Sequence, residues 1–267
     1  MRTATVADVA DLGPRLRRIT LTGPGLAGFA AHGPTDHVKV FFPPTSDGAP
    51  ALPTVRDGAW VDRGSPGLTY REYTVRTHAP GAGAVVLDMT AHAHGPAGRW
   101  VAQAAPGQQL ALLGPKTSKL PPLDRPWYLL AADESGLPAL LNWLDRLPAG
   151  TRVAAFVEVD GPQDELDVAP RPGLTLTWVH RGGQPPGGTL VRDAVARAGG
   201  VVPTATGGDA ADVAAGRAWA GLEAGSARAL RRHLILERGL PRAVVDVTGY
   251  WRAGVAHFDH KSAEATA

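Results

Sequence analysis

The sequence predicts a two-domain protein of the β + α/β class, in which an N-terminal antiparallel six-stranded β-barrel precedes a C-terminal α/β domain with a parallel sheet. Three observations support this prediction. The first 120 residues contain six short strand-like runs, the pattern changes at the Pro-rich stretch 119–126, and strands then alternate with helices. A length of 267 residues also suits two domains of ordinary size.

Short apolar or β-branched runs, separated by Gly- and Pro-rich gaps, make up the first half. Runs of this length and spacing are typical of an antiparallel barrel or of a sandwich. A polar, Pro-rich insertion at 43–69 interrupts them and is expected to form a surface loop. The six strands are expected at 3–9, 16–23, 36–43, 70–78, 84–92 and 108–115.

The second half has the rhythm of a parallel sheet with helices on both faces. Its first strand, 127–132, runs into a helix over 133–147, in which Ser135 is expected to cap the N-terminus and Pro138 to lie in the first turn. We therefore expect domains at 1–122 and 123–255 and a C-terminal tail at 256–267, and we expect the last residues, "SAEATA" (262–267), to be disordered. Further strands are expected at 152–159, 174–180, 217–222 and 243–251, and further helices at 188–198 and 226–239.

Composition excludes several classes of protein. Hydrophobic residues make up 44% and charged residues 19%, which is a globular composition. The absence of cysteine excludes disulfides, cysteinyl iron–sulfur clusters and thiolate zinc sites. No apolar run is long enough to span a membrane and the N-terminus lacks a signal-peptide core, so we expect a cytoplasmic protein, and a monomer.

Arginine greatly outnumbers lysine, although the formal net charge is only +2. No interleaving of aromatic and basic residues accompanies this excess, which argues against nucleic-acid binding. Because the guanidinium fork suits bidentate recognition of phosphate or carboxylate, an anionic small molecule is the expected ligand.

The stretch "REYTVR" (71–76) places two arginines around a Tyr–Thr pair on a predicted strand. Alternation puts Tyr73 on the same face as Arg71, and Thr74 on the same face as Arg76. One interpretation is an ordinary barrel strand with exposed arginines. The other is a flavin site, in which the tyrosine ring stacks on the isoalloxazine, the threonine hydroxyl meets its N5 edge and an arginine binds the pyrophosphate.

The stretch "HAHGPAGRW" (92–100) follows a strand and contains small residues where a helix begins near Pro96. Such a helix N-terminus can bind an anion, although a plain strand-to-helix turn explains the same residues. His92 and His94 resemble a metal pair, but no third ligand of suitable type lies nearby, so we expect no metal site.

Two further stretches lie at the predicted carboxyl ends of strands in the second half. "AADESGLP" (131–138) occupies the place where open α/β folds bind ligands, yet it lacks the G-x-G-x-x-G fingerprint, and Asp133 and Glu134 equally suit a helix cap. "GYWRAG" (249–254) groups aromatic residues beside an arginine and suits either a pocket wall or a core plug.

Taken in order, these stretches resemble the siderophore-interacting protein family, the flavin-dependent ferric-siderophore reductases related to ferredoxin–NADP reductase. The resemblance runs from about residue 14 to 255. The segments that carry it are "DHVKVFFP", "REYTVR", "HAHGPAGRWVAQAAPGQQLALLGP", "WYLLAADESGLPAL", "TWVHRGG", "LRRHLILERGLPR" and "GYWRAG".

The resemblance implies FAD on the barrel and NADPH or NADH on the α/β domain, with electrons passing through the flavin to iron(III) in a ferric siderophore. It implies that Arg71 pairs with the pyrophosphate, Tyr73 stacks on the isoalloxazine and Thr74 reaches N5. The implied flavin residues are Arg71, Tyr73, Thr74, Val75, Arg76, His92, Gly95, Pro96, Ala97, Gly98 and Trp100. The implied nucleotide residues are Asp133, Glu134, Ser135, His180, Arg181 and Glu223.

Lys39 and Arg252 match basic positions that attract the anionic ferric chelate in some relatives, and Lys261 is a weaker candidate. On this interpretation no side chain acts as an acid–base catalyst, because the cofactor carries the chemistry.

Three departures from the family pattern bear on these expectations. Gly98 stands where the family has a serine, which removes one side-chain contact to the flavin phosphate. Leu222 replaces a small residue and is expected to crowd the nucleotide site, and "AADES" replaces the commoner "AGDET". Together they leave reduced ferredoxin open as the electron donor.

Two other functions stay open: a siderophore-binding protein without turnover, and a general flavin or quinone reductase on the same scaffold. The basic residues at the proposed mouth favour an anionic chelate over a quinone.

Overall fold

The computed structural model describes residues 1–45, 48–57, 59–62, 65, 67–92, 95–198, 210–255 and 258. The expected tail at 256–267, apart from residue 258, lies outside these residues, as do His94 and Lys261. The chain divides into two compact units, Met1–Leu120 and Pro121–Ala267.

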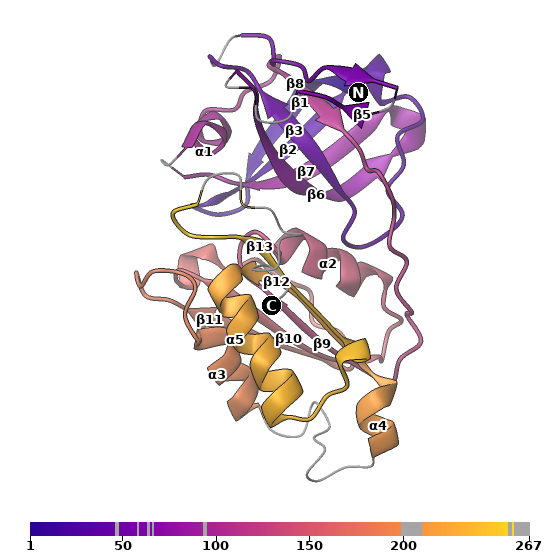
Figure 1. Cartoon of the computed structure of the whole chain (residues 1–267), viewed down its shortest axis with the longest axis vertical. Coiled ribbons are helices and arrows are strands. Elements are labelled where there is room, and N and C mark those ends of the chain that lie inside the picture. Colours follow the sequence, from indigo (N-terminus) through magenta and orange to yellow (C-terminus); the bar gives the residue numbers. More distant parts are fainter. Residues whose placement is uncertain are drawn as a thin grey trace. The chain divides into compact units, whose positions relative to one another are not determined.

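The first unit is a closed antiparallel barrel with the strand order β1-β2-β7-β6-β3-β8 (Figure 1). A barrel leaves no open sheet edge, and it confirms the expected six-stranded architecture over a sandwich. Alternating side chains fill its interior, as β2 illustrates with Ile19 and Leu21 fully buried in the barrel core. The strands are β1 (Arg2–Asp11), β2 (Leu16–Thr22), β3 (His37–Phe42), β6 (Thr69–Ala79), β7 (Ala84–Thr90) and β8 (Gln109–Leu113).

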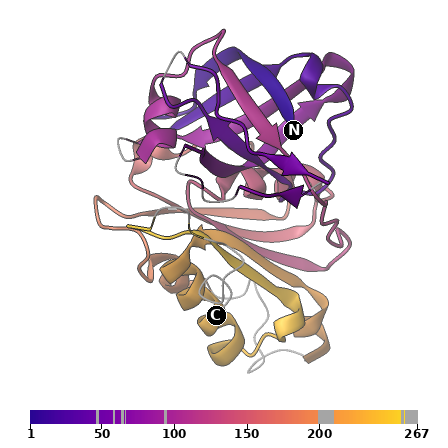
Figure 2. The same ribbon diagram turned by 45° about the horizontal axis from the view of Figure 1, so that its top comes forward.

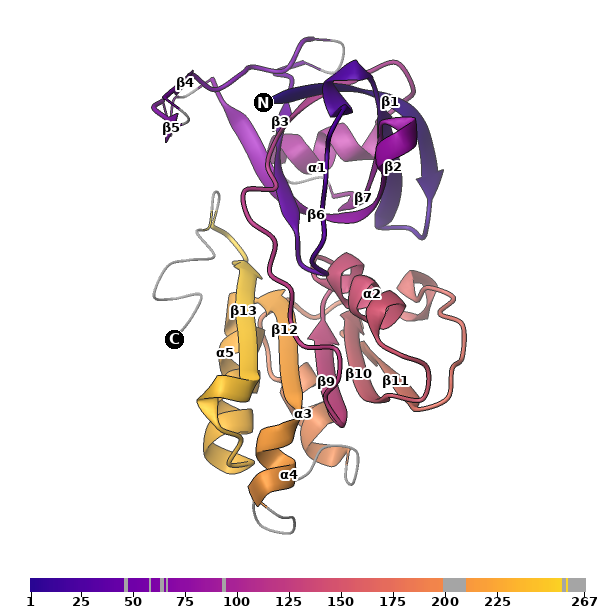
Figure 3. The ribbon, with the colours of Figure 1, turned by 90° about the vertical axis from the view of Figure 1, so that its right-hand side faces the viewer.

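Helix α1 (Gly95–Ala102) closes one end of the barrel, as the views in Figure 1 and Figure 3 agree. Its buried face consists of Ala97, Trp100 and Val101, which belong to the same hydrophobic core as the barrel interior. The barrel therefore fixes the position of this helix relative to β6 and β3.

The expected loop at 43–69 contains a small hairpin of β4 (Val55–Arg56) and β5 (Ala59–Trp60), so the loop prediction was incomplete. Trp60 anchors the hairpin, because its ring lies 4.8 Å from the Tyr70 ring and 5.5 Å from the Phe41 ring. Aromatic contacts of this kind fix a segment that its Pro- and Gly-rich composition alone would leave irregular.

The second unit is a five-stranded parallel sheet with the order β11-β10-β9-β12-β13, which confirms the α/β prediction. This is the doubly wound order, and it reverses between β9 and β12. Every residue of β9 is buried, as expected for a central strand covered on both faces. The strands are β9 (Trp127–Ala132), β10 (Arg152–Val159), β11 (Leu174–His180), β12 (Arg217–Glu223) and β13 (Val245–Trp251).

Helices cover both faces of this sheet. Helices α3 (Leu190–Arg197) and α5 (Ala224–Arg232) share one hydrophobic core with β9, β10 and β12, and Figure 2 shows them along one face. Helix α2 (Leu137–Arg146) covers the other face, where the Trp143 ring lies 5.9 Å from Tyr128 and 6.3 Å from Trp219. Helix α5 continues through a π-helical turn, His233–Glu237, and the short α4 (Ala210–Ala215) was not predicted.

Candidate functional site

Strand β6 directs Arg71 and Tyr73 to the inner face of the barrel. Arg71 pairs with Val40 and Tyr73 with Val38 across the β3–β6 ladder, and both valines are fully buried in the barrel core. Residues directly opposite each other in an antiparallel pair project to the same face. Tyr73 accordingly packs against this core, with its ring 6.2 Å from that of Phe42.

Burial raises the pKa of the Tyr73 phenol, although the positive charge of Arg71 opposes that rise. The ring therefore stays neutral at physiological pH. Thr74 lies on the opposite face, where it is buried and pairs with His37. The structure thus separates Thr74 from Tyr73 by strand face, as the alternation predicted.

Arg76 does not follow the simple alternation expected for it. The β6–β7 ladder shifts register between Val75 and Thr77, so Arg76 is the extra residue of a β-bulge. A bulge bends the strand and redirects a side chain. The prediction that Arg76 shares a strand face with Thr74 assumed a regular strand, and the bulge shows that this assumption was wrong.

Gly98 lets the His92 segment approach helix α1 closely. A Cβ atom at this position would lie 2.4 Å from Nδ1 of His92 and 2.5 Å from its carbonyl oxygen. Local packing therefore explains glycine at this position, because a side chain here would displace His92. Gly95, with φ of 73°, supplies the left-handed turn that starts the helix, and Pro96 follows in the first turn as predicted.

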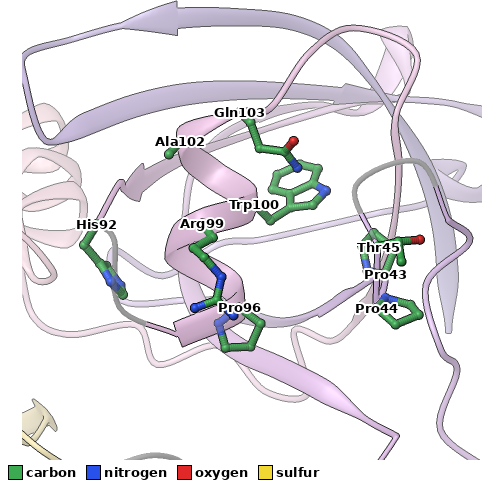
Figure 4. A pocket seen from close by; sticks show the side chains of 9 residues that line it. All are labelled: Pro43, Pro44, Thr45, His92, Pro96, Arg99, Trp100, Ala102 and Gln103. Carbon is green, nitrogen blue, oxygen red and sulfur yellow. The ribbon is translucent and has the colours of Figure 1, made fainter.

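A pocket of about 470 Å³ lies along α1 in the first unit (Figure 4). It brings together three residues of the predicted flavin set, His92, Pro96 and Trp100. Sequence reasoning missed Arg99 and Gln103, although both recur with Pro96 and Trp100 at helical spacing. The lining residues are Pro43, Pro44, Thr45, His92, Pro96, Arg99, Trp100, Ala102 and Gln103.

In the second unit, Asp133 organises the carboxyl end of β9. Its Oδ1 accepts hydrogen bonds from Ser135 N (2.8 Å), Ser135 Oγ (2.6 Å) and Gly136 N (3.2 Å). Its Oδ2 accepts from Glu223 N at 2.7 Å and from Trp251 Nε1 at 2.8 Å. Asp133 therefore joins β9, β12 and β13 at the point where the strand order reverses, which is where doubly wound folds bind ligands.

Ser135 is not the cap of α2, because Gly136 holds the N-cap position without a side-chain cap bond. Asp133 instead accepts from the turn that precedes the helix. Burial raises the pKa of Asp133, with a further contribution from the charge of Glu134, while the hydrogen bonds from Ser135, Trp251 and Gly136 oppose the rise.

Arg181 points into the second unit, where it is only 6% exposed. Its guanidinium forms an ion pair with Glu134, with a 3.1 Å bond from Nη1 to Oε2, and Nη1 lies 3.3 Å from Glu158 Oε1. Burial alone would lower the pKa of Arg181, but the bonds to Glu134 and the charge of Glu158 outweigh it and the pKa is raised. The guanidinium is thus committed to two carboxylates.

Glu158 completes this cluster and was missed in the sequence. Burial raises its pKa to about 7, and the charge of Asp133 adds to that rise while Arg181 opposes it. Its Oε2 atom is buried and has no hydrogen-bond partner among the described residues. A single acid inside the apolar strand "RVAAFVEV" was the available signal.

His180 and Glu223 occupy different surroundings. The Nε2 atom of His180 lies 2.7 Å from Glu165 Oε1, on the half-exposed side of β11. Glu223 is buried as the N-cap of α5, where its Oε2 accepts from Gly225 N and Ser226 N. The expected crowding by Leu222 is wrong, because this side chain is fully buried in the core shared with α3 and α5.

The two predicted substrate residues lie in different units. Lys39, on the face of β3 opposite the barrel core, forms an ion pair with Glu72, and its Nζ lies 5.4 Å from the centre of the Tyr70 ring. Arg252 follows β13, is exposed and forms an isolated β-bridge with Val255. Lys39 thus carries a neutralising partner that the sequence did not reveal.

Two family models match the chain. Residues 5–119 match the siderophore-interacting FAD-binding domain, and residues 125–254 match the siderophore-interacting protein. The chain is 34% identical to the NADPH-dependent ferric-chelate reductase of Escherichia coli K12, over 67% of this chain and 70% of that protein. It is also 34% identical to the ferric vibriobactin reductase of Vibrio cholerae, over 62% of this chain but only 61% of that relative's length.

Solved structures agree with these matches. A siderophore utilization protein from T. fusca is 36% identical with a TM-score of 0.86, covering 98% of this chain and 96% of that one. A siderophore-interacting protein from Aeromonas hydrophila is 27% identical with a TM-score of 0.73, covering 96% and 92%. A ferredoxin reductase of carbazole 1,9a-dioxygenase, 15% identical with a TM-score of 0.60 over 92% of this chain and 65% of that one, shares the fold.

Among the described residues, no helix has both the length and the apolar character needed to cross a membrane.

Proposed function

The chain belongs to the siderophore-interacting protein family, and from this membership we propose that it is an FAD-dependent reductase of ferric siderophores. The proposal rests on one structural observation above all. Strand β6 presents Arg71 and Tyr73 to the inner face of the barrel, and Tyr73 packs against the core to which α1 contributes Ala97, Trp100 and Val101. These are the groups that a flavin ring and its pyrophosphate require.

The first unit would hold FAD. Tyr73 would stack on the isoalloxazine, Arg71 would pair with the pyrophosphate, and Thr74 and Arg76 remain proposed contacts. His92 and the backbone N–H groups of Gly95–Gly98, at the start of α1, would hold the phosphate and ribitol region. The residues fit the group, because Trp100 offers a buried, unpartnered indole N–H beside a pocket within the described part of this unit. Bound FAD would supply two-electron oxidation of the donor and one-electron reduction of iron(III).

The second unit would hold the electron donor at the carboxyl edge of its sheet. Asp133 would shape the turn that faces the ligand, and Glu223 would fix the start of α5. The name of the Escherichia coli relative supports a nicotinamide donor. Arg181 would act by positioning Glu134, because its guanidinium is committed to carboxylates. We therefore do not expect Arg181 to bind the 2′-phosphate, the group that distinguishes NADPH from NADH. We expect NADH to serve as electron donor as well as NADPH does.

The substrate would be an anionic ferric siderophore, attracted by Lys39 and Arg252. Iron is here the cargo of the reaction. Reduction to iron(II) would weaken the chelate and release the metal in the cytoplasm.

An anaerobic assay with a ferrous trap tests the proposal. Purified protein should be yellow, should bleach with a productive donor when air is excluded, and should produce trapped iron(II) from a ferric catecholate or hydroxamate. NADH, NADPH and reduced ferredoxin are compared in parallel. Failure of all three donors with several ferric siderophores would overturn the reductase proposal. Tryptophan quenching without iron(II) would then identify a binding protein, and turnover with quinones alone would identify a general reductase.

A further inference from the structure

Arg252, the proposed substrate cation of the second unit, follows β13 at the carboxyl edge of the sheet. Its side chain is exposed, yet both of its neighbours in the chain are bonded to buried carboxylates. The indole Nε1 of Trp251 donates a hydrogen bond to Asp133 Oδ2 at 2.8 Å. The backbone N–H of Ala253 donates to Glu223 Oε1 at 3.2 Å. An exposed cation is thus fixed on both sides by groups inside the unit.

Other protein donors hold these two carboxylates in place. Asp133 Oδ2 also accepts from the backbone N–H of Glu223 at 2.7 Å, so one oxygen joins β9, β12 and the end of β13. Glu223 Oε2 accepts from the backbone N–H groups of Gly225 and Ser226 at the start of α5. Hydrogen bonds to an ionised acceptor are stronger than those between neutral groups. Both carboxylates are therefore firm anchors for the segment that carries the arginine.

A β-bulge brings this segment to its anchors. The β12–β13 ladder pairs Leu222 with Gly249. The next pair is Glu223 with Trp251, so Tyr250 is the extra residue of the bulge. A bulge bends its strand and redirects side chains. It accounts for the reach of the indole across β12 to the carboxylate at the end of β9.

We infer that Asp133 and Glu223 are positioning residues of the substrate site, which act by holding the chain on both sides of Arg252. The inference rests on the proposed function, in which Arg252 attracts an anionic ferric siderophore. A guanidinium on a fixed backbone loses less conformational freedom when it binds its ligand, and this preorganisation strengthens binding. Loss of either anchor should therefore weaken binding of the chelate through Arg252.

A double-mutant cycle tests this connection in the full chain as purified, with a trianionic ferric tricatecholate as the ligand. Arg252→Ala should raise the Kd about tenfold, and Trp251→Phe, which keeps an aromatic ring but removes the N–H, about fivefold. In the Arg252→Ala background, Trp251→Phe should change the Kd by less than about twofold, because the positioned group is gone. Trp251→Phe should also leave the Kd for an uncharged ferric trihydroxamate within about twofold.

A second variant removes the other anchor. Val255 N donates to Arg252 O at 3.1 Å and Gly254 has a φ of 77°, which are features of a type II turn with Ala253 in its second position. Proline is common at that position, so Ala253→Pro should keep the turn and remove the N–H that reaches Glu223. It should raise the Kd for the tricatecholate about fivefold, as Trp251→Phe does.

Trp127→Phe is the matched control. Trp127 Nε1 donates to the carbonyl oxygen of Asp212 at 2.8 Å, at the opposite end of the sheet, where β9 begins. This variant removes the same kind of hydrogen bond from the same unit. It should leave the Kd for both chelates within about twofold.

Three outcomes would overturn the inference. Additive effects of Trp251→Phe and Arg252→Ala would show that the indole acts independently of the guanidinium. Equal weakening of the charged and uncharged chelates, or an unchanged Kd in both anchor variants, would reduce the anchors to structural groups. An unchanged Kd in Arg252→Ala would remove Arg252 from the substrate site. Absence of both chelate binding and trapped iron(II) with the wild-type chain would instead refute the proposed function itself.

Discussion

Replacing Glu158 with glutamine should change how the stability of the second unit depends on pH. Glutamine keeps the shape of the side chain and an oxygen acceptor for Arg181, but it cannot ionise. Burial raises the pKa of Glu158 from its ordinary 4.5 to about 7. The folded state therefore holds a proton on this carboxyl more tightly than the unfolded state does.

The sign and size of the effect follow from this difference. Because the pKa of Glu158 is raised in the folded state, this group contributes most to the free energy of unfolding below pH 4.5. That contribution is lost as the pH rises to about 7. The loss is on the order of 3 kcal/mol, since one pKa unit corresponds to about 1.4 kcal/mol. The free energy of unfolding of the wild type should thus decline relative to Glu158→Gln across this window, and the difference should be constant at higher pH.

Urea unfolding at a series of pH values measures this difference. Five of the seven tryptophans lie in the second unit, so fluorescence mainly reports its unfolding. Asp167→Asn is the control, because Asp167 is an exposed carboxylate of the same unit. Parallel pH profiles for the wild type and Glu158→Gln would refute the reasoning, and so would a relative stability that rises with pH. The latter result would mean that Arg181 dominates the environment of Glu158.

Three further substitutions test the sites. Gly98→Ala should weaken FAD binding at least tenfold in a titration, because its Cβ would meet the His92 backbone, whereas Gly81→Ala, in open space, should have no effect. Glu72→Gln should release Lys39 and lower the Kd for an anionic ferric siderophore severalfold in a quenching assay; an unchanged Kd would remove Lys39 from the substrate site. Asp133→Asn should lower the free energy of unfolding by about 3 kcal/mol, since an amide group would face backbone or indole donors; a loss below about 1 kcal/mol would contradict the hydrogen-bond network.

Periodicity in the sequence located the barrel strands and the parallel sheet, because those patterns depend on which faces are buried. The details that failed depend on contacts between distant residues. Ser135 lies at a typical capping position, but its backbone N–H and its Oγ hydroxyl both donate hydrogen bonds to the Asp133 carboxylate. The hairpin around Trp60 forms against Phe41 and Tyr70, which no local pattern in the insertion reveals.

The same limit applied to the candidate sites. Strand alternation placed Arg71 and Tyr73 on one face, but it could not reveal the bulge at Arg76, which arises from pairing with β7. Sequence alone identified Arg181 as a cation near the expected nucleotide, yet its charge is satisfied by Glu134 and Glu158 from two other segments. Which partner a charged side chain binds depends on residues that only the fold brings together, so the local sequence cannot reveal it.

The departures from the family pattern have structural explanations that leave the flavin proposal intact. Gly98 lies where the His92 backbone approaches α1, and the serine that the resemblance led us to expect there would meet that backbone. Leu222 fills the core under α5 instead of the ligand edge.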